Sequence, residues 1–320
     1  MVGLDAGGRD ESLGASDARA AAAGVRRRVL VTGGAGYIGS IAVRMLLDRG
    51  ESVTVLDTLE RGHRAAVDSR ARLVVGDVGD RAAVDDALAD CDAVMHFAGY
   101  TLVAESQREP ERYHDNNAER PLALLDAMAR HGVSDLVFSS TAAVYGEPKT
   151  VPIPEDADLA PINAYGASKL RFERALARAR DEWGLSYACL RYFNVVGAWP
   201  DGSRGEDHDP ETHIVPLALA AAACGSTFHL FGDDYPTLDG TCVRDYVNVI
   251  DLVEAHLLAL DALRETGEPL VCNLGTGSGH SNREVIAAVE AATGIPLTVV
   301  VEPRREGDPA ALVASNGRAR

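Results

Sequence analysis

The chain of 320 residues is long enough for a large domain with a smaller lobe, and its 46% hydrophobic and 25% charged residues are typical of a globular protein. A net charge of -17 argues against a nucleic-acid partner or an anionic membrane surface, because both would repel it. The sequence has no window of about 18 apolar residues, so no membrane span is expected. The five cysteines are scattered without CxxC spacing, which predicts reduced thiols in the cytoplasm, with no disulfide framework and no metal site.

Residues 1–26 are rich in Ala, Gly, Asp and Arg, lack the features of a signal peptide, and are expected to form a disordered tail. From Arg27 onward, short β-branched runs alternate with helical periodicity. Strands are predicted at 27–33, 52–57, 72–78, 93–99, 135–141 and 187–196. Helices are predicted between them at 38–49, 80–89, 117–131 and 165–183. This alternation predicts an α/β fold over 27–197, a Rossmann-type doubly wound parallel sheet with helices on both faces.

After residue 197 the alternation breaks down, and 199–213 form a polar connection rich in Pro and Gly. Helices are predicted beyond it at about 214–224, 249–265 and 281–293. Strands are predicted at 228–232, 271–275 and 297–303. We interpret 198–320 as mainly a smaller α/β substrate-binding lobe, and a cleft between two lobes is a common place for a small-molecule site.

The first predicted strand runs into "TGGAGYIGS", which places Gly33, Gly36 and Gly39 around Tyr37 and Ile38 at the start of a helix. In a strand-turn-helix phosphate site, such glycines permit a tight turn, a close backbone approach to a pyrophosphate and close helix packing. The N–H groups of the helix start then face the phosphates. The spacing and context therefore predict a dinucleotide site rather than a structural turn.

The second predicted strand ends at Asp57, whose carboxylate can accept hydrogen bonds from an adenosine ribose. It would repel a 2′-phosphate, since two like charges about 4 Å apart cost about 1–4 kcal/mol. The sequence therefore predicts NAD rather than NADP as the cofactor. Arg61 and Arg64 favour the opposite choice, but in a polar loop we expect both to be solvated.

The third and fourth predicted strands also end in residues that suit a dinucleotide. The carboxylate of an Asp in "GDV" can accept a hydrogen bond from the adenine amine, and the small residues of "FAG" let the cofactor backbone pass. The carboxyl ends of parallel strands are where ligands bind in such sheets. The predicted cofactor contacts at these ends are Asp77, Val78, Phe97, Ala98 and Gly99.

Tyr165 and Lys169 lie one helical turn apart in "NAYGASKL", and Thr141 ends the fifth predicted strand. A free phenol titrates near 10 and is a poor base at neutral pH. A nearby ammonium and a positive nicotinamide ring would lower its pKa, so that tyrosinate can take a proton from a sugar hydroxyl as hydride leaves. We interpret Tyr165, Lys169 and Thr141 as catalytic, with Thr141 hydrogen-bonded to the same oxygen.

The chain resembles the UDP-glucose 4-epimerase family of the extended short-chain dehydrogenase/reductases. The resemblance rests on motifs spread over residues 32–311, namely "TGGAGYIGS", "HFAG", "FSSTAAVYG", "YGASKL", "LRYFNVVGA", "DGTCVRDYVNVIDL", "NLGTG" and "RREGDPA". It implies an isomerase that interconverts UDP-galactose and UDP-glucose through a transient 4-keto sugar, with hydride passed to and from tightly held NAD. It also implies a homodimer that associates through a helix bundle.

The resemblance further assigns residues to the cofactor and to the UDP-sugar. Asn116 and Phe193 would contact NAD. Arg244 and Arg305 would hold the diphosphate and Asp308 the uridine ribose, and Asn194 and His213 would complete the nucleotide site. The geometry of an arginine fork matches phosphate, so these residues can form a locally positive site in an acidic protein.

The sequence departs from the family pattern in three places. Thr101 stands where the family has a Lys that contacts the cofactor. Arg120 and Pro121 replace the usual residues of a helix that would join the dimer contact, and Pro121 is tolerable in a first helical turn. Leu312 aligns with a position that influences acceptance of N-acetylated sugars, and its intermediate size leaves that specificity open.

Other functions stay open from the sequence. A 4-epimerase of UDP-GlcNAc/GalNAc, UDP-xylose/arabinose or UDP-glucuronate shares the same motifs. A nucleotide-sugar 4,6-dehydratase would need an Asp–Glu pair after Thr141, where Ala142 and Ala143 stand. The RREGD and VRDY blocks argue against a simple NAD dehydrogenase. A non-catalytic NAD-sensing protein would not require the intact Thr141, Tyr165 and Lys169.

Overall fold

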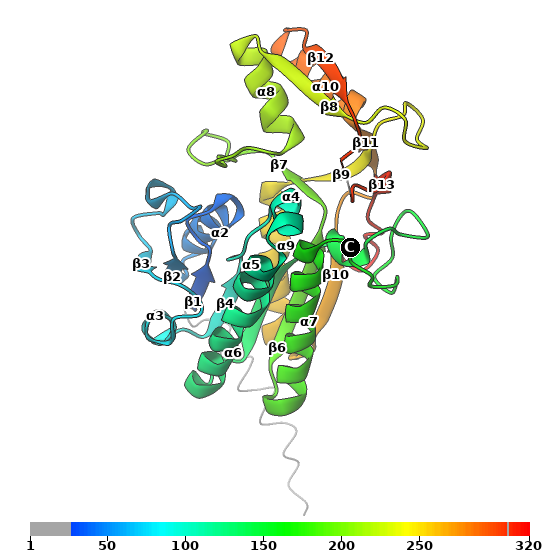
Figure 1. Ribbon diagram of the computed structural model, residues 1–320. Coiled ribbons are helices and arrows are strands. Elements are labelled where there is room, and N and C mark those ends of the chain that lie inside the picture. The colour runs from blue at the N-terminus through cyan, green and yellow to red at the C-terminus, as the bar shows by residue number, and fades with distance from the viewer. Residues whose placement is uncertain (1–26, 306) are drawn as a thin grey trace, which may run out of the picture.

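The computed structural model describes residues 27–305 and 307–320, so the predicted tail over 1–26 lies outside the described residues. A seven-stranded parallel sheet forms the larger unit (Figure 1). In spatial order its strands are β10 (Leu270–Leu274), β6 (Ser186–Tyr192), β5 (Asp135–Thr141), β4 (Ala93–His96), β1 (Arg28–Thr32), β2 (Ser52–Asp57) and β3 (Arg72–Val75). This sheet confirms the predicted Rossmann-type fold class.

Helices cover both faces of this sheet, as expected for strands that are apolar on both sides. On one face lie α2 (Tyr37–Asp48) and α9 (Val249–Thr266), packed over the cluster that includes Val31, Val137 and Leu190. On the other face lie α3 (Arg81–Leu88), α6 (Arg120–His131) and α7 (Ala164–Trp183). Two apolar layers therefore hold the sheet between helices, and the carboxyl ends of the strands are left for the site.

The smaller unit lies beyond the carboxyl edge of the large sheet (Figure 1). In it α8 (Ile214–Cys224) and α10 (Asn282–Thr293) pack on the two-stranded sheet of β8 (Thr227–Phe231) and β12 (Thr298–Glu302). A second small sheet is built around β9 (Val243–Asn248), which pairs with β7 (Asn194–Val196), β11 (Gly279–Ser281) and β13 (Ala311–Leu312). Short helices α4 (Val103–Arg108) and α5 (Pro110–His114) precede α6.

Three sequence predictions need correction. The single strand expected over 187–196 is two strands, because the chain leaves β6 at Tyr192 to pair as β7 with β9 in another sheet. The buried side chain of Phe193, packed with Tyr145 and Leu170, fixes that crossing point. The strand predicted near 271–275 and the helix predicted near 249–265 do not belong to the smaller unit, since β10 pairs with β6 in the large sheet and α9 packs on a face of that sheet.

Among the helices of residues 27–305 and 307–320, none combines the length and the apolar character needed to cross a bilayer.

Candidate active site

A cleft of about 1700 Å³ lies between the carboxyl edge of the large sheet and the smaller unit. Every predicted site residue except Lys169 lines it. Those lining residues are Gly33, Gly36, Tyr37, Ile38, Gly39, Asp57, Asp77, Val78, Phe97, Ala98, Gly99, Asn116, Thr141, Tyr165, Phe193, Asn194, His213, Arg244, Arg305 and Asp308. The fold therefore brings residues as far apart in the sequence as Gly33 and Asp308 to the same cleft.

The glycine loop after β1 leaves space where a phosphate would lie. A Cβ on Gly33 would stand 2.6 Å from the Ala98 nitrogen, and one on Gly39 would stand 2.2 Å from the Gly33 oxygen, so both glycines are required by packing. A Cβ on Gly36 would meet only the Gly33 oxygen, at 3.4 Å, and would occupy the cleft. Within the described chain no side chain caps the start of α2, so its amide N–H groups are free for an anion.

The carboxylate of Asp57 is fixed by backbone at the end of β2. Its Oδ2 accepts a hydrogen bond from the Ala35 nitrogen at 2.9 Å, and its Oδ1 accepts one from the Leu59 nitrogen at 2.8 Å. Each oxygen keeps one further lone pair, which can accept from a ribose hydroxyl. The negative charge at this point also disfavours a phosphate, so the geometry fits NAD better than NADP.

Asp77 has a partner that the sequence did not suggest. Its Oδ2 accepts from the Arg120 guanidinium at 2.6 Å, and its Oδ1 accepts from the Gly79 nitrogen at 2.7 Å. Arg120, which departs from the family pattern, thus ties α6 to the end of β3. The adjacent Pro121 lies in the first turn of α6, where the missing N–H is not needed.

Tyr165 and Thr141 meet in the middle of the cleft. Tyr165 begins α7, where the Asn163 side chain caps the helix by accepting from the Gly166 nitrogen. Thr141 is the last residue of β5, and its side chain lies near the Tyr165 hydroxyl at the cleft. Desolvation raises the pKa of Tyr165, which is only 8% exposed, and neighbouring Tyr192 adds to that increase, while the Thr141 side chain opposes it.

This direction is opposite to the lowering that we expected for Tyr165. The expectation included the positive charge of a nicotinamide ring. In the protein alone, the burial of the phenol outweighs any effect of the Lys169 ammonium on its pKa. The Lys169 Nζ donates to the Ser139 carbonyl oxygen at 3.1 Å and lies 4.9 Å above the Phe138 ring. It is therefore held against β5.

Lys169 itself is 3% exposed, and burial lowers its pKa from 10.5 to about 8. Along residues 27–305 and 307–320, no carboxylate forms an ion pair with its Nζ. A Cβ on Gly99 would lie 3.3 Å from this nitrogen, so the small residue at the end of β4 leaves room for it. An ammonium so placed is desolvated and has no carboxylate partner, and it can stabilise a phenolate.

Arg244 lines the cleft beside the smaller unit. Arg244 is buried, donates to the Val243 oxygen at 2.8 Å and forms an ion pair with Asp308. Its sequence neighbour Asp245 points elsewhere, because its carboxylate accepts from the amides of Thr276 and Ala314. The structure therefore brings Arg244 and Asp308 together as a pair.

The other predicted nucleotide contacts line the same end of the cleft. The Arg305 guanidinium lies 4.1 Å above the Phe231 ring. Asn194 begins β7, and His213 precedes α8 and contacts Glu206. All three residues line the cleft, and the contact of His213 with Glu206 was not expected from the sequence.

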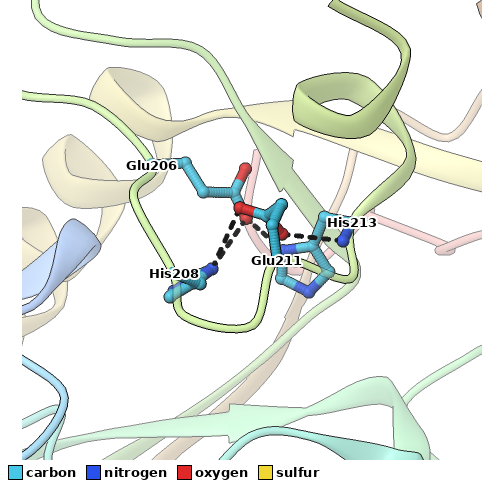
Figure 2. A group of neighbouring side chains, drawn as sticks. All are labelled: Glu206, His208, Glu211 and His213. Atoms are coloured by element: carbon cyan, nitrogen blue, oxygen red, sulfur yellow. Dashed lines mark hydrogen bonds and ion pairs between the residues drawn. The ribbon is translucent and has the colours of Figure 1, made fainter. Parts of the chain in front are cut away.

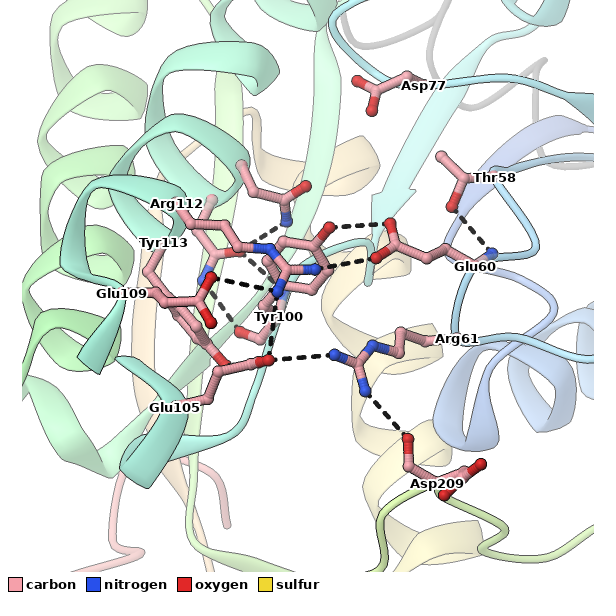
Figure 3. A network of polar contacts seen from close by, with 12 residues as sticks. Thr58, Glu60, Arg61, Asp77, Tyr100, Glu105, Glu109, Arg112, Tyr113 and Asp209 are labelled. Atoms are coloured by element: carbon pink, nitrogen blue, oxygen red, sulfur yellow. Dashed lines mark hydrogen bonds and ion pairs between the residues drawn. The ribbon is translucent and has the colours of Figure 1, made fainter. Parts of the chain in front are cut away.

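Sequence reasoning also missed a network of charged side chains beside the loop that follows β2 (Figure 3). Arg61 is not simply solvated, because it donates to the Asp209 carbonyl at 3.0 Å and to Glu105 at 3.2 Å. Arg112 in turn binds Glu105 at 3.2 Å and Glu60 at 3.0 Å. The alternating Glu and Arg residues of 105–112 were the available signal. The network connects the loop after β2, α4–α5 and the 199–213 segment across the cleft.

Comparisons with known proteins agree with this architecture. A family model described as the NAD dependent epimerase/dehydratase family matches residues 29–275. A UDP-glucose 4-epimerase of Lactobacillus helveticus is 52% identical over 92% of this chain and 90% of its own length.

Solved structures give the same result. A UDP-glucose 4-epimerase from Brucella ovis in complex with NAD is 44% identical, with a TM-score of 0.88 over 92% of this chain and 91% of that one. A UDP-glucose 4-epimerase from Bifidobacterium longum in complex with NAD+ and UDP is 38% identical, with a TM-score of 0.87 over 91% of each chain.

Proposed function

The chain belongs to the NAD dependent epimerase/dehydratase family, and on that basis we propose that it interconverts UDP-galactose and UDP-glucose through a transient 4-keto sugar. The observation that carries the proposal is the single cleft, which holds the glycine loop, Tyr165 with Thr141, and Arg244 with Asp308. A dinucleotide site, a proton-transfer pair and a diphosphate site are the three parts that such a reaction needs. The names of the similar proteins support the same activity.

Bound NAD supplies the hydride acceptor and donor at C4 of the sugar. Tyr165 Oη removes the proton of the C4 hydroxyl, and Thr141 Oγ1 positions that oxygen by a hydrogen bond. The Lys169 ammonium stabilises the phenolate from below. Arg244 and Arg305 hold the diphosphate in place while the sugar turns over, so that the hydride can return to its other face.

The decisive test is to incubate the purified chain with UDP-galactose without added NAD and to follow UDP-glucose by chromatography. Conversion without added cofactor is the expected result, because no net oxidation occurs and NAD stays bound. Failure to convert the substrate even with NAD supplied would contradict the proposal. Turnover of UDP-xylose or UDP-glucuronate alone would assign the same chemistry to another sugar.

Leu312 is predicted to set the breadth of sugar specificity. It lines the cleft in β13, next to Arg244 across the register. Leu312→Tyr should lower kcat/KM for UDP-GalNAc by at least about tenfold relative to UDP-galactose, since a larger side chain excludes the N-acetyl group. Leu312→Ala should change that ratio in the opposite direction. An unchanged ratio in both variants would remove Leu312 from the specificity site.

Arg61 is predicted to retain the cofactor, because it ties the 199–213 segment to the NAD side of the cleft. Arg61→Ala should weaken NAD binding about tenfold, as expected for losing a partly exposed charge-assisted pair. Bound NAD can be measured by chromatography after gel filtration and its Kd by calorimetry. Arg70→Ala is the matched control, since Arg70 pairs with Asp48 and Asp68 outside the cleft. Equal retention in both variants would contradict the role.

We also propose a homodimer and a cytoplasmic location. The helices α6 and α7 lie side by side on one face of the large sheet, and Arg171 of α7 pairs with Glu119 just before α6. Together they offer the pair of helices that a four-helix contact between two copies requires. The free thiols of the five cysteines support a reducing compartment. Light scattering coupled to gel filtration would test the dimer, and a monomer at micromolar concentration would contradict it.

A further inference from the structure

Four side chains of the segment before α8 converge on one point (Figure 2). They come from the sequence E-x-H-x-x-E-x-H and are Glu206, His208, Glu211 and His213. One ligand atom from each lies within 4.8 Å of the others. The described segment between β7 and Ile214 has no helix or strand, and contacts among these side chains help to hold it in this shape.

The distances within this cluster suit a tetrahedral ion. His208 Nδ1 lies 3.3 Å from Glu206 Oε1 and 3.6 Å from Glu211 Oε2, and His213 Nδ1 contacts Glu206 Oε1 directly. Four N or O ligands about 2.0–2.1 Å from a tetrahedral Zn²⁺ are about 3.3–3.5 Å apart. Small side-chain shifts would therefore place all four donors around one ion.

The donors of the cluster are not well aligned with one another. His208 Nδ1 faces both carboxylates, at 3.3 Å from Glu206 Oε1 and 3.6 Å from Glu211 Oε2, but within the described residues it makes no well-formed hydrogen bond to either. Buried polar atoms in proteins are almost always satisfied. The Glu206 side chain is only 7% exposed, and the groups nearest to its carboxylate are the two histidine side chains of the same cluster.

We propose that Glu206, His208, Glu211 and His213 bind a divalent transition metal, most readily Zn²⁺. Two imidazoles and two carboxylates are ligands that Zn²⁺ takes, and a site closed by four protein ligands is structural rather than catalytic. The sequence predicted no metal because that expectation looked for cysteine spacing alone. The spacing of the two histidines and two glutamates was the signal available instead.

The position of the cluster indicates what the ion does. The same segment contacts the NAD side of the cleft through the Asp207 carbonyl near His63 and the Asp209 carbonyl held by Arg61. Its other end continues into α8 at the nucleotide end. An ion there holds the 199–213 segment, which joins the two sides of the cleft, in one conformation. It stabilises the enzyme without taking part in hydride or proton transfer.

The test uses the full chain purified without a histidine tag, dialysed against EDTA and then titrated with ZnCl₂ in a calorimeter. Binding of about one Zn²⁺ per chain with a submicromolar Kd is expected, together with a higher melting temperature. His208→Ala and the conservative Glu211→Gln should each weaken binding at least about tenfold. His280→Ala, which removes an exposed histidine near Glu284, should bind as the unmodified chain does.

Reconstitution with Co²⁺ gives a readout that is independent of stability. A tetrahedral site should produce visible d–d absorption that the His208→Ala chain lacks, while circular dichroism shows that both are folded. The proposal fails if the folded chain shows no saturable Zn²⁺ binding. It also fails if His208→Ala and Glu211→Gln bind as tightly as His280→Ala, since the ion would then be held elsewhere.

Discussion

Tyr165→Phe is expected to lower kcat for UDP-galactose by about 10²- to 10⁴-fold, the usual contribution of a positioned acid–base group. The substitution removes one oxygen, the phenol oxygen that lies near Thr141 at the cleft. The ring stays in its buried place, so the packing of α7 against β5 is preserved. KM should change little, because Arg244 and Asp308 at the far end of the cleft are untouched.

The measurement is the rate of UDP-glucose formation at saturating substrate, with bound NAD determined for each sample. Tyr187→Phe is the matched control, since Tyr187 is a half-buried tyrosine of β6 that does not line the cleft. It should turn over at the normal rate. A Tyr165→Phe chain that retains near-normal kcat with its NAD would exclude Tyr165 as the base and leave Thr141 to be tested.

Local signals predicted the parallel sheet and its cofactor loop. Alternating strands and helices require cover on both sheet faces, and the packing of Gly39 against the Gly33 backbone allows no side chain, so both features are encoded within short windows. The carboxyl-edge rule then places Asp57 and Thr141 at one edge without any long-range information. For this reason the elements of residues 27–197 could be predicted from the sequence in detail.

The features that the sequence did not predict depend on contacts between distant segments. Nothing near Phe193 indicates that the chain changes sheets there, because its partner strand β9 lies about 50 residues further on. The pairing of Arg120 with Asp77 and of Arg61 with the Asp209 carbonyl likewise joins separate loops. Burial also decides the pKa of Tyr165, and burial is a property of the assembled fold.

Lys169→Met is expected to abolish most turnover and at the same time to stabilise the folded chain. We propose that the ammonium favours the Tyr165 phenolate, so kcat should fall at least about 10²-fold. Its burial is unfavourable, however, because a pKa lowered from 10.5 to about 8 corresponds to about 3 kcal/mol at 1.36 kcal/mol per pH unit. Loss of the hydrogen bond to the Ser139 carbonyl destabilises the variant by about 1 kcal/mol and so offsets part of this gain.

The sign of the pH dependence distinguishes this explanation from simple repacking. Below pH 8 the folded chain must hold a charged Lys169, so the full cost is present and the variant should be more stable by about 2 kcal/mol. As pH rises from 8 toward 10.5, Lys169 becomes neutral in the folded chain while it stays charged in the unfolded chain, and the difference should shrink. Urea unfolding of the two cofactor-free proteins at pH 7, 8 and 9 measures it.

The chain offers a single matched control, because Lys149 is its only other lysine. Lys149 is exposed and pairs with Asp158, so Lys149→Met should change neither turnover nor the pH dependence of stability. A Lys169→Met chain that is less stable than the unmodified one at pH 7 would show that the ammonium is held favourably by its surroundings. A stability gain that stays constant from pH 7 to 9 would assign the effect to packing of the methionine instead. A gain that decreases with rising pH would show that the desolvated Lys169 ammonium, which the proposed reaction needs, lowers the stability of the folded chain.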